Sequence, residues 1–370
     1  MPTMINRGKE LIRISPYYAM NELQCKIGTT SSGEPFSFDL AKLPHLLIGG
    51  ACGQGKTQCI HSIICSLLEQ KSPSELRFVL IDPKCIELSV YKPLAGSYLL
   101  SFVENESEDA IVHDFSHAVN TLNALCAEMR HRYELLAAAR VRNISQYNAK
   151  SSQPLTYIVV VIDEYGDLAM MQSKKEIESP VIELAQKARA VGIHLVISTQ
   201  RTSNDVLTNE LKTNCPARIA FRVCSEKESR IILDKKGAEC LTAKGEMLFS
   251  NWDNFVHVKG AMVADDEIER IVKHIAVQNP ETGPYVLPKP AEEGSLFIKD
   301  EDPLLREAAN FVVREQCASF TLLQQELHIG YMRAGKIIDR LNEMGVVGPG
   351  HPREVLVKDE SSLEEIFEQL

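Results

Sequence analysis

The chain has 370 residues, of which 44% are hydrophobic and 24% are charged, a composition typical of soluble globular proteins with two or three domains. The net charge of −10 argues weakly against nucleic-acid binding, although positive charge gathered in a pore or on one helix would still permit it. There is no apolar run of membrane-span length, no secretory signal at the start and no C-x-x-C pair among the ten cysteines. We therefore expect a cytoplasmic protein with reduced thiols and without zinc.

The first 40 residues are predicted to form a short lead-in. Residues 28–35 are predicted as a turn because they are rich in Gly, Ser and Thr, and residues 36–40 alternate like an edge strand. Residues 41–278 are predicted to form one α/β domain with a mostly parallel sheet, because buried strands alternate with helices.

A glycine-rich loop lies between an apolar run at 43–48, predicted as a buried strand, and an amphipathic run at 57–68, predicted as a helix. The loop fits the Walker A pattern of a P-loop NTPase, and backbone N–H groups of such a loop surround phosphates. The residues predicted to bind ATP are Gly50, Ala51, Cys52, Gly53, Gln54, Gly55, Lys56 and Thr57. Lys56 is expected to reach the β- and γ-phosphates, and the Thr57 hydroxyl to ligate Mg²⁺.

A second acidic motif follows later in the chain. Residues 76–84 predict a buried strand with a charged turn, and apolar residues at helical spacing over 122–136 predict a long helix. The β-branched run at 157–162 predicts a buried parallel strand that ends in Asp163 and Glu164. We expect Asp163 to hold the hydration shell of Mg²⁺ and Glu164 to act as general base. The alternative is that the two carboxylates only cap a helix N-terminus.

Two further polar residues are candidates for the same chemistry. The strand predicted at 194–199 ends in Gln200, which would sense the γ-phosphate and the attacking water, unless it is only a surface residue. Arg189 is predicted near the end of a helix that precedes Gly192. It either compensates the helix dipole or acts as an arginine finger in a neighbouring subunit.

The last third of the chain is predicted to contain a linker and a small domain. Residues 279–301 are rich in Pro, Gly and Glu without periodicity, residues 302–358 predict three helices and a hairpin, and residues 359–370 form an acidic tail. Three helices and a hairpin describe a winged helix, whose third helix reads DNA. Arg333, Lys336 and Arg340 would face the DNA, or would form an ordinary solvated face.

These motifs resemble those of the FtsK/SpoIIIE DNA translocases over about residues 27–358. The segments that carry the resemblance are 46–56, 81–91, 128–133, 141–144, 163–164, 186–194, 199–201 and 229–234, with 302–304, 329–331 and 353–356 resembling the family's DNA-orienting γ domain. Residues 1–40 would then be a remnant of the family's α domain, and the membrane region is missing. This chain has Cys52, Gln54, Met332 and Lys336 where the family usually has Thr, Ser, Asn and Arg, and its wing is shortened between 350 and 353.

The resemblance implies a RecA-like motor of the FtsK/HerA type, and a hexameric, ATP-driven translocase of double-stranded DNA. It also implies that Arg189, or else Arg230, comes from the neighbouring subunit, and that the γ-like domain loads the ring on DNA and sets its direction. A site-specific recombinase is a further partner to consider. Two alternatives stay open: a conjugative coupling or secretion ATPase of the same superfamily, and a non-motor DNA-binding regulator. The predicted winged helix favours DNA over a protein cargo.

Overall fold

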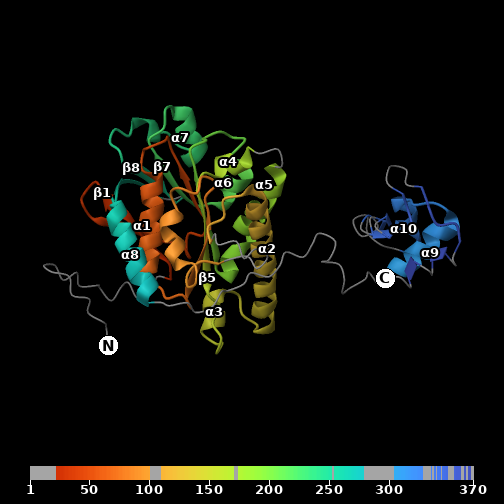
Figure 1. Cartoon of the computed structure of the whole chain (residues 1–370). Helices are drawn as coiled ribbons and strands as arrows, with labels where there is room; N and C mark the ends of the chain where they lie inside the picture. Colours follow the sequence, from red (N-terminus) through yellow and green to blue (C-terminus); the bar gives the residue numbers. More distant parts are fainter. Residues whose placement is uncertain are drawn as a thin grey trace. The chain divides into compact units, whose positions relative to one another are not determined.

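The computed structural model describes residues 22–100, 110–170, 174–251, 254–278 and 304–327, together with part of the positions between 335 and 367. The chain divides into two compact units, Met1–Pro290 and Ala291–Leu370. Both units are drawn in Figure 1.

The first unit is built on one mixed sheet. Among the described residues its strand order is β2-β1-β9-β8-β7-β3-β6-β5-β4. The strands from β7 to β4 pair in parallel, and those from β7 to β2 pair antiparallel. The bounds are β1 Gln24–Thr30, β2 Pro35–Asp39, β3 Leu46–Gly49, β4 Leu76–Ile81, β5 Tyr157–Ile162, β6 Ile193–Thr199, β7 Ala217–Phe221, β8 Glu246–Ser250 and β9 Phe255–Gly260.

The predicted α/β class is confirmed, and the runs predicted as buried strands form the parallel half of the sheet. The antiparallel strands β1, β8 and β9 were not predicted. The turn predicted over 28–35 is shorter than expected, because residues 28–30 complete β1 and pair with β9.

Helices connect the strands and begin where the sequence offers caps. Asp114 accepts a hydrogen bond from the backbone N–H of His117 at 3.0 Å, and Ser225 accepts one from Glu228 at 3.3 Å. The bounds are α1 Lys56–Leu68, α2 Phe115–Ala138, α3 Ile144–Asn148, α4 Tyr165–Ala169, α5 Lys174–Lys187, α6 Asn209–Asn214, α7 Glu226–Leu233 and α8 Asp265–Gln278, with 3₁₀ turns η2 Ser89–Leu94, η3 Ala188–Val191 and η4 Ala238–Cys240.

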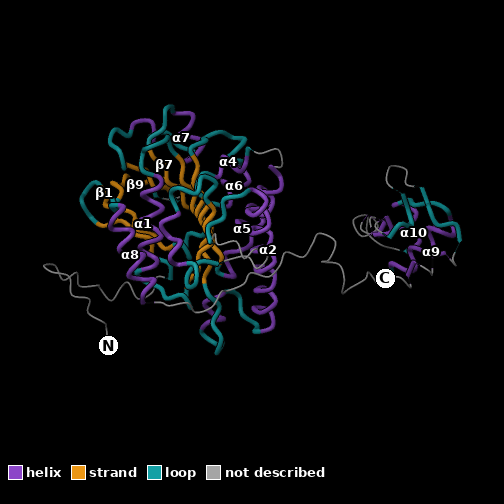
Figure 2. The backbone as a smooth tube through the Cα atoms, viewed as in Figure 1, coloured by secondary structure: helices purple, strands orange, loops and turns teal. Residues whose placement is uncertain are grey.

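Helices cover both faces of the sheet, so the central strands β3, β5 and β6 are buried along their whole length. Val159 and Val161 of β5 pack with α1 and α8, whereas Ile158 and Val160 pack with α2 and α5. Figure 2 shows the strands between the two groups of helices. This burial on both sides explains why β5 reads as a continuous β-branched run rather than an alternating one.

The outer side of the last strand, β4, is already paired. Phe78 bonds through its N–H to Tyr98 and through its carbonyl to Leu100, each at 2.8 Å. Val112 donates to Leu80 and accepts from Asp82. Short extended pieces of the following loop therefore cover this edge of the sheet.

The second unit contains α9 (Leu305–Glu315) and α10 (Phe320–Glu326), followed by helical positions between 335 and 342. Val347 and Val355 form an antiparallel bridge, and Gly348 donates to Glu354 at 2.7 Å. The apolar core of this unit includes Val312, Leu323, Ile338, Leu341 and Val346. The arrangement agrees with the predicted three helices and hairpin of a winged helix.

Several predicted features fall on other parts of the chain. The predicted linker over 279–301, most of the lead-in, Arg333 and Lys336 lie outside the described residues, as does part of the acidic tail. Arg340 is described and is partly exposed. Within the described residues, the structure contains no helix that combines the length and the apolar character needed to span a membrane.

Candidate active site

The polar residues singled out from the sequence gather at one edge of the sheet. Strands β3, β6, β5 and β4 are adjacent and parallel, so their carboxyl ends open onto the same side. The residues that directly follow these strands are Gly50, Gln200, Asp163 and Asp82. Open α/β sheets bind their ligands at this edge.

The glycines of the phosphate loop are needed for close packing as well as for backbone conformation. Gly50 has φ 153°, and a Cβ there would lie 2.7 Å from the Cβ of Phe221. Gly55 has φ 120°, and its Cβ would lie 3.0 Å from the Phe221 ring and 3.3 Å from Gly245. The loop therefore rests on the end of β7, where larger residues would push it out of position.

Lys56 is the first residue of α1 and is buried beneath the loop. Its ammonium donates to the carbonyl oxygens of Gly50 and Ala51, both at 2.8 Å. Burial lowers the pKa of Lys56, while the negative charges of Glu164 and Asp163 oppose that shift. Among the described residues, the hydrogen bonds of this buried cation go to two loop carbonyls, so it is suited to an anionic ligand.

Asp163 is a buried carboxylate at the end of β5. Burial raises its pKa from 3.8 to about 6, and the charges of Asp82 and Glu164 add to the rise. Three carboxylates in one buried place repel one another, so the site favours a cation that would neutralise them.

Replacing Asp163 by asparagine is expected to make stability less dependent on pH. Because the native pKa is raised, the stabilising contribution of the protonated carboxyl is complete below about pH 3.8 and is lost as pH rises through about 6. Between pH 5 and pH 8 this loss should be about 1–1.5 kcal/mol in the wild type and absent in Asp163→Asn. Urea unfolding at pH 5 and pH 8 measures this change in the free energy of unfolding. The control is Asp205→Asn, at an exposed position. An equal pH dependence in wild type and Asp163→Asn would contradict the raised pKa.

Glu164 has a left-handed backbone, with φ 54° and ψ 53°, which is costly for a non-glycine residue. Its side chain is buried, and Oε1 accepts from the Thr199 hydroxyl at 3.2 Å and from the Gln200 N–H at 3.0 Å. Both bonds use Oε1, so among the described residues Oε2 is the oxygen left for a water molecule. A strained, buried and oriented carboxylate suits a general base better than a helix cap, and Glu164 makes no capping bond to α4.

A network of ion pairs at the surface lies beside Glu164. Asp167 of α4 pairs with Arg201 at 3.3 Å and with Lys84 at 3.5 Å, so the ends of β4, β5 and β6 are joined by charge. Gly166 allows the close approach, because a Cβ there would lie 2.8 Å from the Thr199 hydroxyl. Gln200 itself is exposed, and its backbone, not its side chain, contacts Glu164.

Arg189 lies at the opposite edge of the sheet from the phosphate loop. It belongs to η3, a 3₁₀ turn after α5 rather than the end of the helix itself, and precedes the amino end of β6. The residue is exposed, and its guanidinium donates to the Lys42 carbonyl, ahead of β3, at 3.2 Å. Arg189 is therefore remote from the nucleotide site of its own chain.

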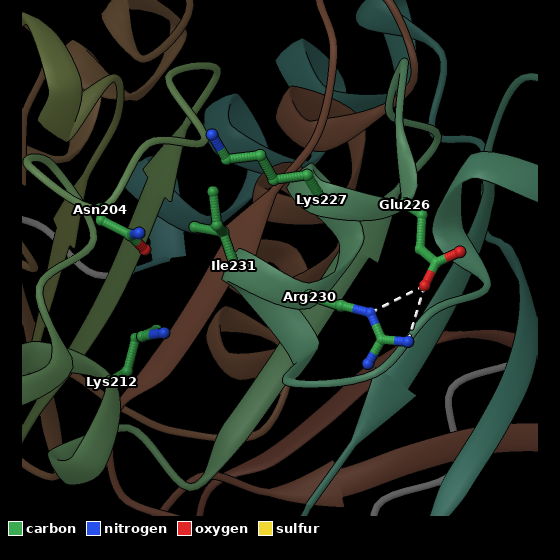
Figure 3. A pocket seen from close by; sticks show the side chains of 6 residues that line it. All are labelled: Asn204, Lys212, Glu226, Lys227, Arg230 and Ile231. Atoms are coloured by element: carbon green, nitrogen blue, oxygen red, sulfur yellow. Dashed lines mark hydrogen bonds and ion pairs between the residues drawn. The ribbon is translucent and has the colours of Figure 1, made fainter.

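Arg230 lies in a different place, on α7 at an open surface pocket. Its guanidinium is bonded to Glu226 at 2.8 and 2.6 Å, as Figure 3 shows. The pocket is also lined by Asn204, Lys212, Lys227 and Ile231. This ion pair is exposed, as Arg189 is, so the pairing with Glu226 does not decide between the two arginines.

The residues at the carboxyl edge fit a nucleotide and a magnesium ion. Gly50 and Gly55 hold the loop close to Phe221, where a Cβ would collide, Lys56 supplies a buried cation, and the N-terminus of α1 adds a favourable dipole. Thr57 and Asp163 could hold Mg²⁺, because hydroxyl and carboxylate oxygens are the ligands it prefers.

The sequence did not indicate all of these residues. Thr199, Asp167, Arg201 and Lys84 become neighbours only through the order of the strands. Asp82 could have been found, because it follows a buried strand at 76–81 just as Asp163 follows the strand at 157–162.

Comparisons with known proteins agree with this architecture. Residues 18–204 match the FtsK/SpoIIIE family, and residues 299–358 match the FtsK gamma domain. The chain is 43% identical over 358 residues to the DNA translocase FtsK of Chlorobaculum tepidum, which covers 93% of this chain and 44% of that protein. It is 40% identical over 360 residues to the DNA translocase SftA of Bacillus subtilis, covering 94% and 37%. The chain thus spans less than half the length of these relatives.

Solved structures show the same fold. The pCW3 conjugation coupling protein TcpA matches with a TM-score of 0.58 at 29% identity, covering 70% of this chain and 72% of that one. The cytoplasmic domain of the Thermomonospora curvata secretion ATPase EccC matches with a TM-score of 0.62 at 23% identity, covering 74% and 33%, and supports the fold alone. The two family matches and the identity to the translocases together lead to one assignment: the chain belongs to the FtsK/SpoIIIE family.

Proposed function

We propose that this chain is an ATP-driven motor that moves double-stranded DNA. The observation that carries the proposal is the meeting of Lys56, Asp163 and Glu164 at one edge of the sheet, in a chain whose relatives are named DNA translocases. The phosphate loop, from Gly50 to Thr57, binds the phosphates of ATP. Lys56 exchanges its two carbonyl partners for phosphate oxygens.

Hydrolysis needs an activated water and a stabilised γ-phosphate. Glu164 orients the water and accepts its proton on Oε2, while Thr199 and the Gln200 N–H hold Oε1 in place. The side chain of Gln200 reports the presence of the γ-phosphate. Thr57 and, through water, Asp163 would hold Mg²⁺, which would supply positive charge beside the phosphates.

Arg189 completes the site of a neighbouring copy. An exposed guanidinium remote from its own phosphate loop has this role only in an assembly, and we propose a hexameric ring. Arg230, exposed on α7, is the second choice. The second unit loads the ring on DNA through the helix that the sequence predicts to carry Arg333, Lys336 and Arg340. We place this activity in the cytoplasm, with a site-specific recombinase as an additional partner.

The alternative functions are less well supported. TcpA, a conjugation coupling protein, shares the fold at 29% identity, below the 43% and 40% of the translocases. A match to the FtsK gamma domain over 299–358 further favours a DNA cargo over a secreted protein. The full set of Lys56, Thr57, Asp163 and Glu164 argues against a regulator without ATPase activity.

Double-stranded DNA is expected to raise the rate of ATP hydrolysis strongly, because a motor of this kind cycles on its track. Steady-state ATPase measurements with and without duplex DNA test this, with Lys56→Ala as the inactive control. A secretion ATPase would not respond to DNA. An ATPase rate that is the same at all DNA concentrations would therefore reject the motor proposal.

A further inference from the structure

Two consecutive residues of α2 hold both ends of the 3₁₀ turn η3, which carries Arg189. The hydroxyl of Tyr133 donates to the carbonyl of Lys187, just before the turn, at 2.6 Å. The guanidinium Nη1 of Arg132 donates to the carbonyl of Val191, the last residue of the turn, at 3.0 Å. The four residues of η3 are thus clamped against α2 from both sides. Helix α2 lies beside α5, which leads into the turn (Figure 1).

The clamp leaves little freedom to the backbone that carries Arg189. Gly192, directly after the turn, has a left-handed backbone, and a Cβ there would lie 2.4 Å from Ile144. Ala188 and Val191 are buried, so they fix the inner side of the turn, whereas Arg189 is exposed. A turn held in this way presents the Arg189 side chain from a defined position.

Burying the Arg132 guanidinium costs free energy, so a contribution to stability does not explain this residue. It is fully buried, and its Nε donates to Glu128 Oε1 at 2.7 Å. Its Nη2 is buried without a hydrogen-bond partner among the described residues. Buried ion pairs contribute little or nothing compared with apolar side chains of similar size, and an unsatisfied buried donor is a further cost. A guanidinium at this position can donate to the carbonyls of Thr156 and Val191, whereas an apolar side chain could not.

Arg132 also touches the strand that carries the general base. The same Nη1 donates to the carbonyl of Thr156 at 2.8 Å, directly before β5. At its other end β5 leads to Asp163 and Glu164. One buried side chain therefore ties the turn that would serve the neighbouring site to the strand of the chain's own site.

We propose that Arg132, assisted by Tyr133, is a positioning residue that sets the place of Arg189 for entry into the neighbouring subunit's nucleotide site. The inference rests on the proposed role of Arg189 and names the group through which that role is controlled. The hydrogen bonds of Arg132 and Tyr133 lie on α2, at the turn and before β5, away from the phosphate loop, so the proposed route of their effect on turnover is the turn.

The test uses Arg132→Lys and Tyr133→Phe in the full chain. Lysine keeps the charge beside Glu128, but one ammonium cannot reproduce the forked contact with two carbonyls and a carboxylate. Because misplacing a reacting group by about 1 Å can cost 10²-fold, kcat of Arg132→Lys should fall by about 10- to 100-fold, with the affinity for ATP unchanged. Tyr133→Phe loses only the hydroxyl of a partly exposed side chain, and a several-fold fall is expected, on the order of one hydrogen bond.

Arg130→Lys is the matched control. Arg130 lies on the same helix and pairs with Glu183 of α5 at 3.0 Å, so it anchors α2 without touching η3. The kcat of Arg130→Lys should change by less than about twofold, because exposed ion pairs contribute little to stability. Should Arg132→Lys fail to fold, Tyr133→Phe carries the test, since the exposed hydroxyl is not part of the core.

Mixed assemblies separate the positioning role from a direct effect on the chain's own site. Co-assembled with Glu164→Ala chains, which have an intact clamp and an intact Arg189, Arg132→Lys chains should regain turnover, as Arg189→Ala chains should. No gain would mean that Arg132 acts on its own β5, and would overturn the inference. Full activity of Arg132→Lys and Tyr133→Phe beside an inactive Arg189→Ala would overturn it too. Full activity of Arg189→Ala itself would instead reject the proposed role of Arg189.

Discussion

Replacing Arg189 by alanine is expected to lower ATP turnover by a factor on the order of 10³–10⁵, the range that arginine fingers provide, without weakening ATP binding. Arg189 lies at the amino edge of β6, whereas its own phosphate loop lies at the carboxyl edge, so it can stabilise transition-state charge only in another copy. Turnover and nucleotide affinity of the purified variant test this prediction. Arg230→Ala is the matched control and should retain most of the activity.

The same variant gives a second readout when it is mixed with Glu164→Ala. Each variant lacks one half of an interface, so a mixed ring contains some interfaces with both Glu164 and Arg189 intact. Turnover should partly return, although neither protein is active alone. If Arg189→Ala hydrolyses ATP at the normal rate by itself, Arg189 is not the finger, and Arg230 becomes the candidate.

The second large effect is expected for Glu164→Ala, which should bind ATP normally but hydrolyse it about 10²- to 10⁴-fold more slowly. The variant removes the carboxylate that Thr199 and the Gln200 N–H orient, while the phosphate loop and Lys56 stay in place. Nucleotide affinity by fluorescence titration and turnover by phosphate release separate the two functions.

Lys56→Ala is the complementary variant, because it removes the buried cation and should abolish nucleotide binding. The pair of variants therefore distinguishes binding from hydrolysis within one site. Equal ATP affinity in wild type and Lys56→Ala would show that the nucleotide does not bind at this loop.

Local patterns were sufficient to predict the parallel half of the sheet. The run 157–162 is β-branched and flanked by turns, and a strand that is buried on both faces needs little more to be recognised. Strand β9 is largely exposed or half-buried, so its sequence lacks the continuous apolar run that marks β5. The pairing of β9 with β1 joins residues more than 200 positions apart, which no local pattern reports.

The same division holds for the candidate site. The phosphate loop and Asp163-Glu164 were predicted because their chemistry is contained in a few consecutive residues. The bond from Thr199 to Glu164 joins residues 35 positions apart, and that from Arg132 to Val191 joins residues 59 apart. Both bonds depend on which strands and helices pack side by side in the fold, and a local stretch of sequence does not contain that information. The helix end predicted at Arg189 is a 3₁₀ turn for a similar reason, since contacts from α2 shape it.

The covered edge of β4 has a consequence for any assembly of this chain. Its outward N–H and C=O groups are already bonded to residues 98–100 and 112, so a second copy cannot extend the sheet from this side. Subunits of a ring would then meet through side chains and loops rather than through a shared ladder of backbone bonds. Such contacts can slide and re-form with little cost, whereas a continuous sheet would lock adjoining protomers together. This kind of joint suits a machine whose subunits must shift against each other in every cycle.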